Sequence, residues 1–370
     1  MMGPMPAPVI QFAPRPGLLD LGWGHPRPSL LPVDAWASAS AAASRTYGWE
    51  QLAYGSGPGP GPLLEWLADH VGDASVAQTF VTGGASHGLA LVTELLTRPG
   101  DVVLVDAPTY HLAFGILTGR GATLVPVPAA DPDAVAATLD RLRAAGRRVP
   151  LFYLVPTFAN PTGTSLTARA ELIALARRHD VTLVEDDTYR ELAYDGPAPP
   201  ALWRLAAGEG VVRLGTFAKT VAPGLRLGWI NAAPSLVRDL TGLGYVDSGG
   251  GVNHATALTM AVFAGSGAYP KHVTEIREQY RRQRDALVAA LGVESPAGGW
   301  FLWLRLPEGV RAATLLPVAE AHGTSFVPGP RFYVDGRGGA DRIRLSFSML
   351  TPDELTEAAA RLRSSVASRA

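Results

Sequence analysis

The sequence predicts an α/β protein with a mostly parallel sheet, helices on both faces, and a small α+β domain at the C-terminus. Short segments of continuous apolar character alternate with amphipathic segments such as 167–179, which carries Leu172, Leu175 and Ala176 on one face. Continuous apolar strands separated by helices are typical of parallel sheets that are buried on both sides. We expect these buried strands at 102–105, 151–155, 181–184 and 211–214.

The pattern changes after Pro270, and this change predicts the small domain. A long helical run at 271–291 leads into alternating strands and helices, with strands at 298–304 and 342–347 and helices at 311–322 and 352–367. We expect three parts: 1–45 as an irregular N-terminal arm that packs with the small domain, 46–270 as the large domain, and 271–370 as the small domain.

Composition excludes several classes of protein. Of the 370 residues, 47% are hydrophobic and 18% are charged, which is typical of a folded chain with one large and one smaller domain. The net charge of −1 provides no field for a polyanion, so we expect no nucleic-acid partner. The absence of cysteine excludes disulfides, thiolate zinc sites and thiol catalysis. We find no signal-peptide pattern and no membrane-spanning run, and we expect a cytoplasmic protein without a membrane partner.

Polar segments follow directly on the predicted strands. Because ligands of parallel sheets bind outside the carboxyl ends of the strands, we expect these segments to line one site. They are 106–110, 156–163, 186–189 and 216–219.

The last of these segments places Lys219 just past an apolar strand. Thr216 lies three residues before this lysine and Arg226 lies seven residues after it. A lysine that forms a Schiff base needs a sheltered, fixed position, and a phosphorylated cofactor beside it needs hydroxyl and guanidinium donors. For this pattern in isolation, a surface lysine before a turn is the alternative.

Further motifs stand in order along the chain: the glycine-bearing turn 82–88, 106–110, Asn-Pro-Thr-Gly at 160–163, 185–189, Pro-Gly at 328–329, and Arg344 in 343–347. With the Lys219 segment, this ordered set resembles the class I and II aminotransferases, which are fold-type-I pyridoxal-phosphate (PLP) enzymes of the aspartate aminotransferase superfamily. The resemblance runs from about residue 20 to 350. It is closest in pattern to the 2-aminoadipate and kynurenine aminotransferase-like branch.

The resemblance implies PLP as the cofactor, bound to Lys219 as a Schiff base. Lys219 is then the general base and acid, Asp186 pairs with the ring nitrogen, and Tyr189 bonds the phenolic oxygen. Asp187 is the alternative to Asp186 if the register slips by one residue. A Mg²⁺ site or a solvated turn is the alternative for the three adjacent acids, but no second acidic cluster supports a metal, and we expect none.

The resemblance also implies which residues contact the rest of the cofactor. Tyr110 stacks on the ring, and Asn160 bonds both the phenolic oxygen and the substrate carboxylate. Ala85 stands where the family often has a hydroxyl, so Ser86 is the substitute. The expected phosphate ligands are Gly84, Ala85, Ser86, Thr216, Arg226 and, across a dimer interface, Tyr54.

Arg344 lies mid-strand between apolar neighbours, where a buried guanidinium needs an anionic partner. The resemblance assigns it to the substrate α-carboxylate, with a structural ion pair as the alternative. It also places Gly24 in the segment that borders the substrate. Trp23, His25, Trp300 and Trp303 can line an aromatic pocket or belong to the core, and His111 is a further candidate for substrate contact.

These assignments predict a homodimeric aminotransferase of amino-acid metabolism and biosynthesis, which moves an amino group between an L-amino acid and a 2-oxo acid. The same residues also support a PLP-dependent lyase, or a decarboxylating or oxidative deaminase of a natural-product pathway. A more remote alternative is a PLP-binding transcriptional regulator, because relatives of the domain are fused to DNA-binding winged helices. The sequence leaves the substrate side chain open.

Overall fold

The computed structural model describes residues 10–11 and 15–368, and its centre is a seven-stranded sheet. Strand β8 runs antiparallel to both of its neighbours, and all other pairs are parallel. The predicted mostly parallel α/β fold is therefore confirmed. The strands, in sheet order, are β2 (Thr79–Thr82), β8 (Gly228–Asn231), β7 (Val211–Thr216), β6 (Thr182–Asp186), β5 (Leu151–Leu154), β3 (Val102–Asp106) and β4 (Thr123–Val127).

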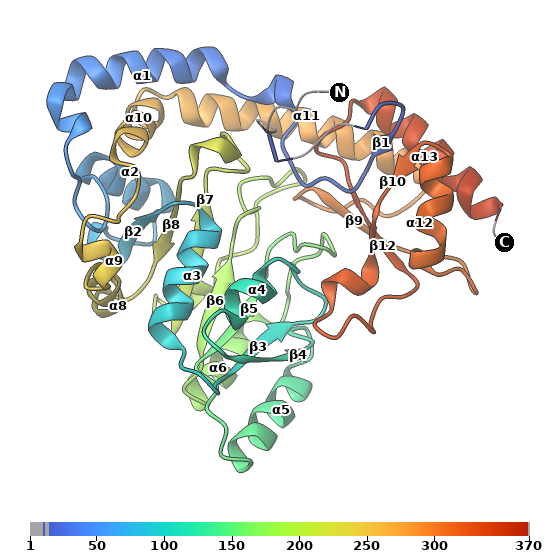
Figure 1. The fold of residues 1–370 in the computed structure, drawn as a ribbon, viewed down its shortest axis with the longest axis horizontal. Coiled ribbons are helices and arrows are strands. Elements are labelled where there is room, and N and C mark those ends of the chain that lie inside the picture. The colour runs from blue at the N-terminus through green and yellow to red at the C-terminus, as the bar shows by residue number, and fades with distance from the viewer. Residues whose placement is uncertain (1–9, 12–14, 369–370) are drawn as a thin grey trace, which may run out of the picture.

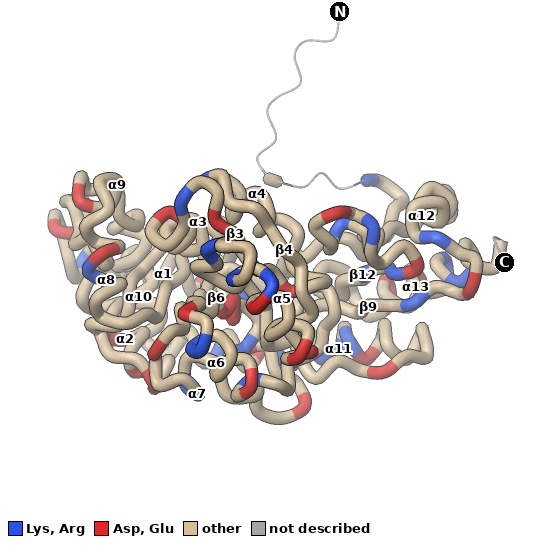
Figure 2. Tube along the Cα trace, turned by 90° about the horizontal axis from the view of Figure 1, so that it is seen from below, with Lys and Arg blue, Asp and Glu red and all other residues tan. Residues whose placement is uncertain are grey.

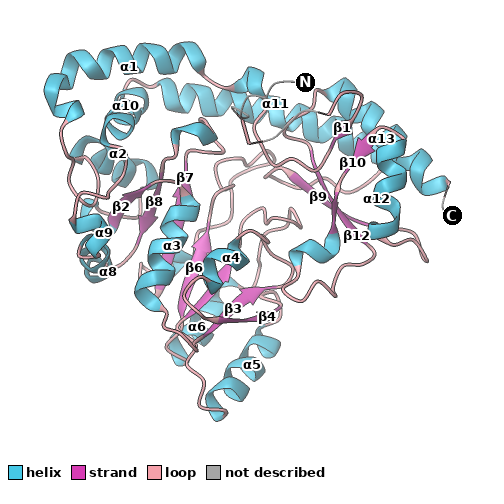
Figure 3. Ribbon diagram, viewed as in Figure 1, coloured by secondary structure: helices cyan, strands magenta, loops and turns pink. Residues whose placement is uncertain are grey.

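Helices cover both faces of this sheet (Figure 3). Val103 and Val105 of β3 point into one apolar core while Val102 and Leu104 point into another, as the alternation of side chains along a strand requires. The first core contains residues of α3 (Ala85–Leu96), α4 (Ala113–Thr118) and α8 (Pro234–Thr241). The second contains residues of α5 (Pro132–Ala144), α6 (Arg169–Arg178) and α7 (Leu202–Leu205).

The prediction that residues 1–45 are irregular is wrong for 33–45. Helix α1 (Val33–Tyr47) is rich in alanine, the strongest helix former, and ends at Gly48. It packs against α10 (His254–Gly265), and a third core joins Ala39 of α1 to residues of α10 and of α2 (Gly61–Val71). Figure 1 shows α1 lying along the same edge of the molecule as α10 and α11.

The small C-terminal unit begins where α11 (Ala268–Leu291) leads across to a second sheet (Figure 1). Its antiparallel strands follow the order β11 (Val327–Pro328), β12 (Arg342–Ser346) and β9 (Phe301–Arg305), with α12 (Ala312–Ala321) and α13 (Pro352–Ala367) beside them. Strand β1 (Leu19–Asp20) pairs with β10 (Thr324–Ser325) in parallel. The N-terminal segment is thereby attached to this unit, while the predicted domain boundaries stay a prediction. The remaining elements are α9 (Gly244–Asp247) and the 3-10 helices η1 (Pro28–Leu30), η2 (Gly48–Leu52), η3 (Val76–Gln78), η4 (Pro223–Leu225) and η5 (Gly329–Phe332).

Charge is spread over the surface in both signs. Figure 2 shows Lys and Arg interspersed with Asp and Glu on the face viewed. Within residues 10–11 and 15–368, no helix is long and apolar enough to cross a membrane.

The parallel pairing places the ends of several strands at one edge of the central sheet. Asp106 ends β3, Asp186 ends β6 and Thr216 ends β7, and Asp186 pairs with Leu214 across the β6–β7 register. The predicted polar segments therefore meet at this edge, as parallel strands require.

Gly215 of β7 gives a test of how tightly this edge is packed. A Cβ atom at Gly215 would lie 2.1 Å from Cε2 of Trp229, its register partner on β8. We expect Gly215→Ala to lower the free energy of unfolding by about 1–3 kcal/mol, because overpacking displaces the indole. Denaturant unfolding measures this, with Gly115→Ala as the control, because a Cβ atom there meets nothing within 4 Å. Equal stability of the two variants would contradict the packing described.

Candidate active site

Lys219 lies in the loop after β7 and reaches the N-terminal segment. Its Nζ donates to the carbonyl oxygen of Gly24 at 3.2 Å and lies 4.9 Å from the centroid of the Trp300 ring. The loop is shaped by its own hydrogen bonds: the Ala218 N–H donates to Thr216 Oγ1 at 3.1 Å, and the Val221 N–H donates to a backbone carbonyl at 2.8 Å. The lysine predicted from the sequence is therefore held in place and is not a free surface side chain.

The surroundings of Lys219 favour its neutral form. Burial lowers the pKa of the amine from 10.5 to about 8, and the positive charges of Arg344 and Arg226 act in the same direction, while Asp186 opposes them. A lysine with a lowered pKa has more of the unprotonated amine available near neutral pH, which a nucleophile or a general base requires.

Asp186 presents one free carboxylate oxygen in the site. Its Oδ2 accepts a hydrogen bond of 2.7 Å from the hydroxyl of Tyr153, whereas its Oδ1 is buried and has no hydrogen-bond partner within the described chain. Burial raises the pKa of this carboxyl, and the bond from Tyr153 opposes the shift. A buried acceptor without a partner fits a protonated ring nitrogen.

The neighbouring acids are engaged elsewhere. Asp187 Oδ2 accepts from Arg213 Nε at 2.9 Å and also from Arg190, on the side of the sheet opposite to Asp186. Glu185 accepts from the backbone N–H groups of Leu202 and Trp203 at 2.9 and 3.0 Å. This arrangement favours Asp186 over Asp187 as the residue facing the site. Within the described residues no group of three or more His, Cys, Asp or Glu side chains could hold a metal ion.

Arg344 of β12 is buried without an acidic partner in the described part of the chain. Its Nη1 donates to Asn160 Oδ1 at 3.0 Å and its Nη2 to the carbonyl oxygen of Gly22 at 2.5 Å, while its Nε has no partner among the residues that the structure describes. Its guanidinium carbon lies 4.4 Å from the ring centroid of Phe301 and 5.1 Å from that of Phe332. The structural ion pair considered above is therefore not what holds it, and a bound carboxylate would supply the missing negative charge.

Arg344 also fixes the orientation of the Asn160 amide. A guanidinium can only donate, so Oδ1 faces it and the NH₂ group of Asn160 is left to donate to another group. Tyr189 is buried beside this amide; burial raises the pKa of its hydroxyl, and hydrogen bonding with Asn160 opposes the rise. The edge of its ring faces Trp300, with centroids 5.8 Å apart.

The other end of the site can hold an anion. Gly84 precedes α3 with φ 97°, and a Cβ atom there would lie 2.8 Å from Arg226 Nη2. Only glycine therefore lets this guanidinium approach the N-terminus of α3. The first-turn N–H groups of Ala85 and Ser86 have no acceptor within the helix and can donate to a ligand, as at phosphate sites. The exposed Ser86 can add a hydroxyl that Ala85 lacks, so this end fits a phosphate group.

Tyr110 and Tyr54 are the two predicted cofactor contacts that remain to be placed. Tyr110 is half-buried, and burial together with the charge of Asp186 raises the pKa of its hydroxyl. Tyr54 is 92% exposed, lies beside Gly249, and forms no hydrogen bond within the described chain. The structure of one chain thus brings together the predicted residues other than Tyr54.

Sequence reasoning missed several residues that complete the site. Tyr153 was assigned only to a buried strand, although a buried tyrosine hydroxyl needs a partner and so signals a polar neighbour. The carbonyl of Gly22 and the rings of Phe301 and Phe332 carry no motif of their own. The ring of Trp300 faces the Lys219 amine, whereas the ring of Trp303 contacts that of Phe332, with centroids 5.5 Å apart.

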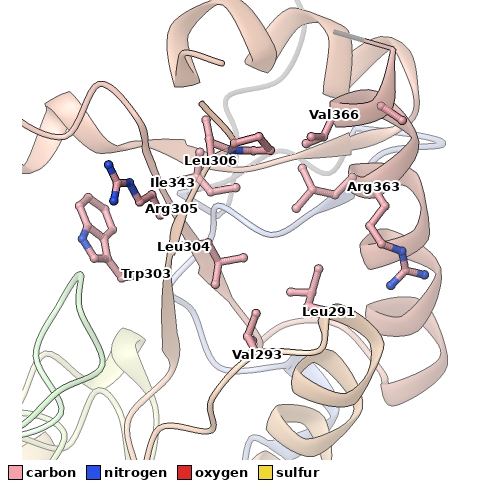
Figure 4. Close-up of a pocket in the computed structure, with 12 residues that line it drawn as sticks. Leu291, Val293, Trp303, Leu304, Arg305, Leu306, Ile343, Arg363 and Val366 are labelled. Atoms are coloured by element: carbon pink, nitrogen blue, oxygen red, sulfur yellow. The ribbon is translucent and has the colours of Figure 1, made fainter. Parts of the chain in front are cut away.

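A separate cavity of about 470 Å³ lies in the small unit, between β9, β12 and the ends of α11 and α13 (Figure 4). Leu304, Ile343 and Val366 give it an apolar lining. Of its two arginines, Arg305 is paired with Asp341 at 3.0 Å and Arg363 donates to a backbone carbonyl. Because this cavity gathers none of the groups around Lys219, we take the edge of the central sheet as the candidate active site.

The lowered pKa of Lys219 can be measured directly. Lys219 and Lys271 are the only lysines in the sequence, so acetylation of each is resolved by mass spectrometry. In the cofactor-free folded chain we expect Lys219 acetylation to rise with a midpoint near pH 8, because the neutral amine is the reactive form. After unfolding, the midpoint should move to about 10.4, while the exposed Lys271 reports on the reagent in the same samples. The same midpoint in folded and unfolded chains would refute the electrostatic description.

Comparison with known proteins identifies the family. Residues 17–362 match the family described as Aminotransferase class I and II. The chain is 32% identical to a 2-aminoadipate transaminase of Thermus thermophilus, over 96% of this chain and 91% of the relative. It is 30% identical to Aromatic-amino-acid aminotransferase 1 of Thermococcus litoralis, over 97% and 90%. A solved kynurenine aminotransferase of Pyrococcus horikoshii in complex with PMP has a TM-score of 0.86 and 29% identity, and the match covers 95% of this chain and 91% of that one. The chain therefore belongs to the class I and II aminotransferases.

Proposed function

We propose that this chain moves an amino group between an L-amino acid and a 2-oxo acid, with PLP held at Lys219. The observation that carries the proposal is that two charged groups near this lysine, Asp186 Oδ1 and the Arg344 guanidinium, are buried without a full set of partners among the described residues. One fits a protonated ring nitrogen and the other fits a carboxylate. When bound, PLP supplies an electron sink for the bond that breaks at the substrate Cα.

The residues of the sheet edge are proposed to hold the cofactor. Asp186 keeps the ring nitrogen protonated, the Asn160 amide and Tyr189 hydroxyl bond the phenolic oxygen, and Tyr110 covers the ring. The proposed phosphate ligands are Gly84, Ala85, Ser86, Thr216 and Arg226, with Tyr54 from a second copy of the chain.

The remaining residues are proposed to orient the substrate and move its proton. Arg344 binds the α-carboxylate, and Asn160 and the Gly24 segment border it. This fixes the Cα–H bond relative to the ring, and orientation decides which bond breaks. Lys219, released from the cofactor when the substrate amine replaces it, would take the proton from Cα and later return one.

A homodimer is part of the proposal. Trp49, Leu52 and Tyr54 are 77%, 84% and 92% exposed, and Tyr245 is 63% exposed. Large apolar side chains exposed in this way are typical of a surface that a partner covers. In a dimer, Tyr54 would reach the phosphate site of the other subunit. The cytoplasmic location stays a prediction.

Transfer and elimination differ in what a single turnover leaves behind. With the PLP-loaded enzyme and an amino acid in the absence of a 2-oxo acid, we expect one 2-oxo acid per site, loss of the aldehyde form of the cofactor, and no ammonia. Lys219→Ala should abolish this conversion, because it removes the proton-transfer group, whereas Lys271→Ala should retain it. Ammonia release with recovery of PLP would instead indicate the lyase or deaminase chemistry. Absorbance and ammonia assays separate the two.

The proposed role of Arg344 in binding the substrate carboxylate can be tested by comparing its substitution with that of Arg342 on the same strand. Arg344→Lys keeps the charge but loses the planar guanidinium, so we expect KM for amino acid and 2-oxo acid to rise about 10- to 100-fold. Arg342→Lys is the matched control and should leave KM unchanged, because Arg342 is half-buried and lies 3.9 Å from Asp341. Steady-state kinetics with both substrates give the answer, and equal KM values for the two variants would exclude Arg344 as the carboxylate ligand.

A further inference from the structure

The loop that carries Lys219 is also held by a hydrogen bond at the next residue, Thr220. The hydroxyl of Thr220 lies 3.1 Å from the hydroxyl of Tyr269, in the first turn of α11, and both side chains are buried. The Tyr269 hydroxyl also bonds Glu191 Oε2. Since a carboxylate only accepts and a phenol has one proton, Tyr269 donates to Glu191 and Thr220 donates to Tyr269.

Glu191 extends this chain of hydrogen bonds to a third element. Its Oε1 bonds Nε2 of His70 on α2, and its backbone carbonyl accepts from Arg277 on α11. Burial raises the pKa of the Glu191 carboxyl, but the bonds from His70 and Tyr269 and the charges of His70 and Arg277 outweigh burial and hold the pKa below its usual value. Glu191 is therefore a half-buried anion with one donor at each carboxylate oxygen, two residues after Tyr189.

Aromatic rings enclose the same bonds. Trp66 stacks on the His70 ring, with centroids 4.5 Å apart. It also forms a T-shaped contact with the Tyr269 ring, with centroids 5.0 Å apart. The ring centroid of Phe217, two residues before Lys219, lies 5.8 Å from that of Tyr269 and 5.0 Å from that of Trp229. The orientation of the Tyr269 hydroxyl is thus set by packing on several sides.

Packing alone does not hold the loop on this side. A cavity of about 100 Å³ borders Thr216, Thr220, His70 and Glu191, and it also reaches Trp229. Where a cavity replaces contacting atoms, side chains lose part of their packing energy. Directional hydrogen bonds are then the interactions that can fix the backbone at Thr220.

We propose that Tyr269 and Glu191 are positioning residues for Lys219. Through Thr220 they fix the peptide next to the lysine. Because Glu191 lies in the segment that follows β6, they also link this loop to Asp186 at the end of β6 and to Tyr189 just after it. A displacement of the amine by about 1 Å is expected to lower the rate up to about 100-fold. The inference rests on the proposed function for its effect on rate, but its effect on the loop is independent of the reaction.

The test removes each hydroxyl singly and then both. Tyr269→Phe and Thr220→Val each delete one end of the bond, Thr220→Ser keeps it, and the double variant completes the cycle. In the cofactor-free chain, we expect amide hydrogen exchange over 216–222 to quicken about 5- to 10-fold in each single variant, no further in the double variant, and not at all in Thr220→Ser.

In the loaded enzyme, the same variants should lower kcat while KM for the amino acid stays within about twofold. The pH midpoint of the visible absorbance should shift in Tyr269→Phe and Thr220→Val and return to the wild-type value in Thr220→Ser. Tyr280→Phe is the matched control: it deletes a buried hydroxyl about three turns further along α11 and should change neither exchange over 216–222 nor kcat.

The outcomes separate the two proposals. Additive effects of Tyr269→Phe and Thr220→Val on exchange, or effects equal to those of Tyr280→Phe, would overturn the positioning role. If the wild-type enzyme yields no 2-oxo acid, the proposed function fails, while the exchange comparison in the cofactor-free chain still decides the positioning role. Thermal unfolding of each variant shows that the compared chains are folded.

Discussion

Burial of charge without a full set of partners is the constraint on which this site depends. Among the described residues, Asp186 has no partner for one carboxylate oxygen and Arg344 has none for its charge or its Nε, and the Lys219 amine has a pKa of about 8. Each arrangement is unfavourable in an isolated chain, because polar groups lose hydration on burial. The cores on both faces of the sheet hold the groups there. The site is thus built before a ligand arrives, so little reorganisation is needed when charge develops during the reaction.

Distant parts of the chain contribute to one cluster through backbone groups as well as side chains. The carbonyl of Gly22 accepts from Arg344 and that of Gly24 accepts from Lys219, so the N-terminal segment bridges the small unit and the central sheet. The pairing of β1 with β10 attaches that segment to the small unit. The proposed substrate end therefore depends on contacts across both units, whereas the proposed phosphate end belongs to the central sheet and α3. The hydrogen bonds that run from His70 through Glu191 and Tyr269 to Thr220 hold the residue next to the lysine.

Much of the fold could be predicted because its signals are local. Continuous apolar runs marked β3, β5, β6 and β7, and the polar residues after them marked the edge where a ligand binds. Helix α1 was missed although its alanines favour a helix, because the irregular Pro- and Gly-rich segments around it dominated the prediction for residues 1–45. Tyr153 was missed as a site residue because nothing in an apolar strand tells which hydroxyl meets a carboxylate from the next strand.

The sequence by itself determined the family and the fold class and predicted Lys219 as the cofactor lysine, because the ordered motifs follow the strands that carry them. Only the tertiary structure distinguishes Asp186 from Asp187, since Asp186 at the end of β6 accepts from Tyr153, whereas Asp187 just beyond the strand accepts from Arg213. It also showed that Arg344 has no ion pair with any described residue and that Tyr54 lies away from the other predicted site residues of its own chain. Motifs specify residue types at positions along the chain, whereas partners and burial depend on which segments the folded core brings together.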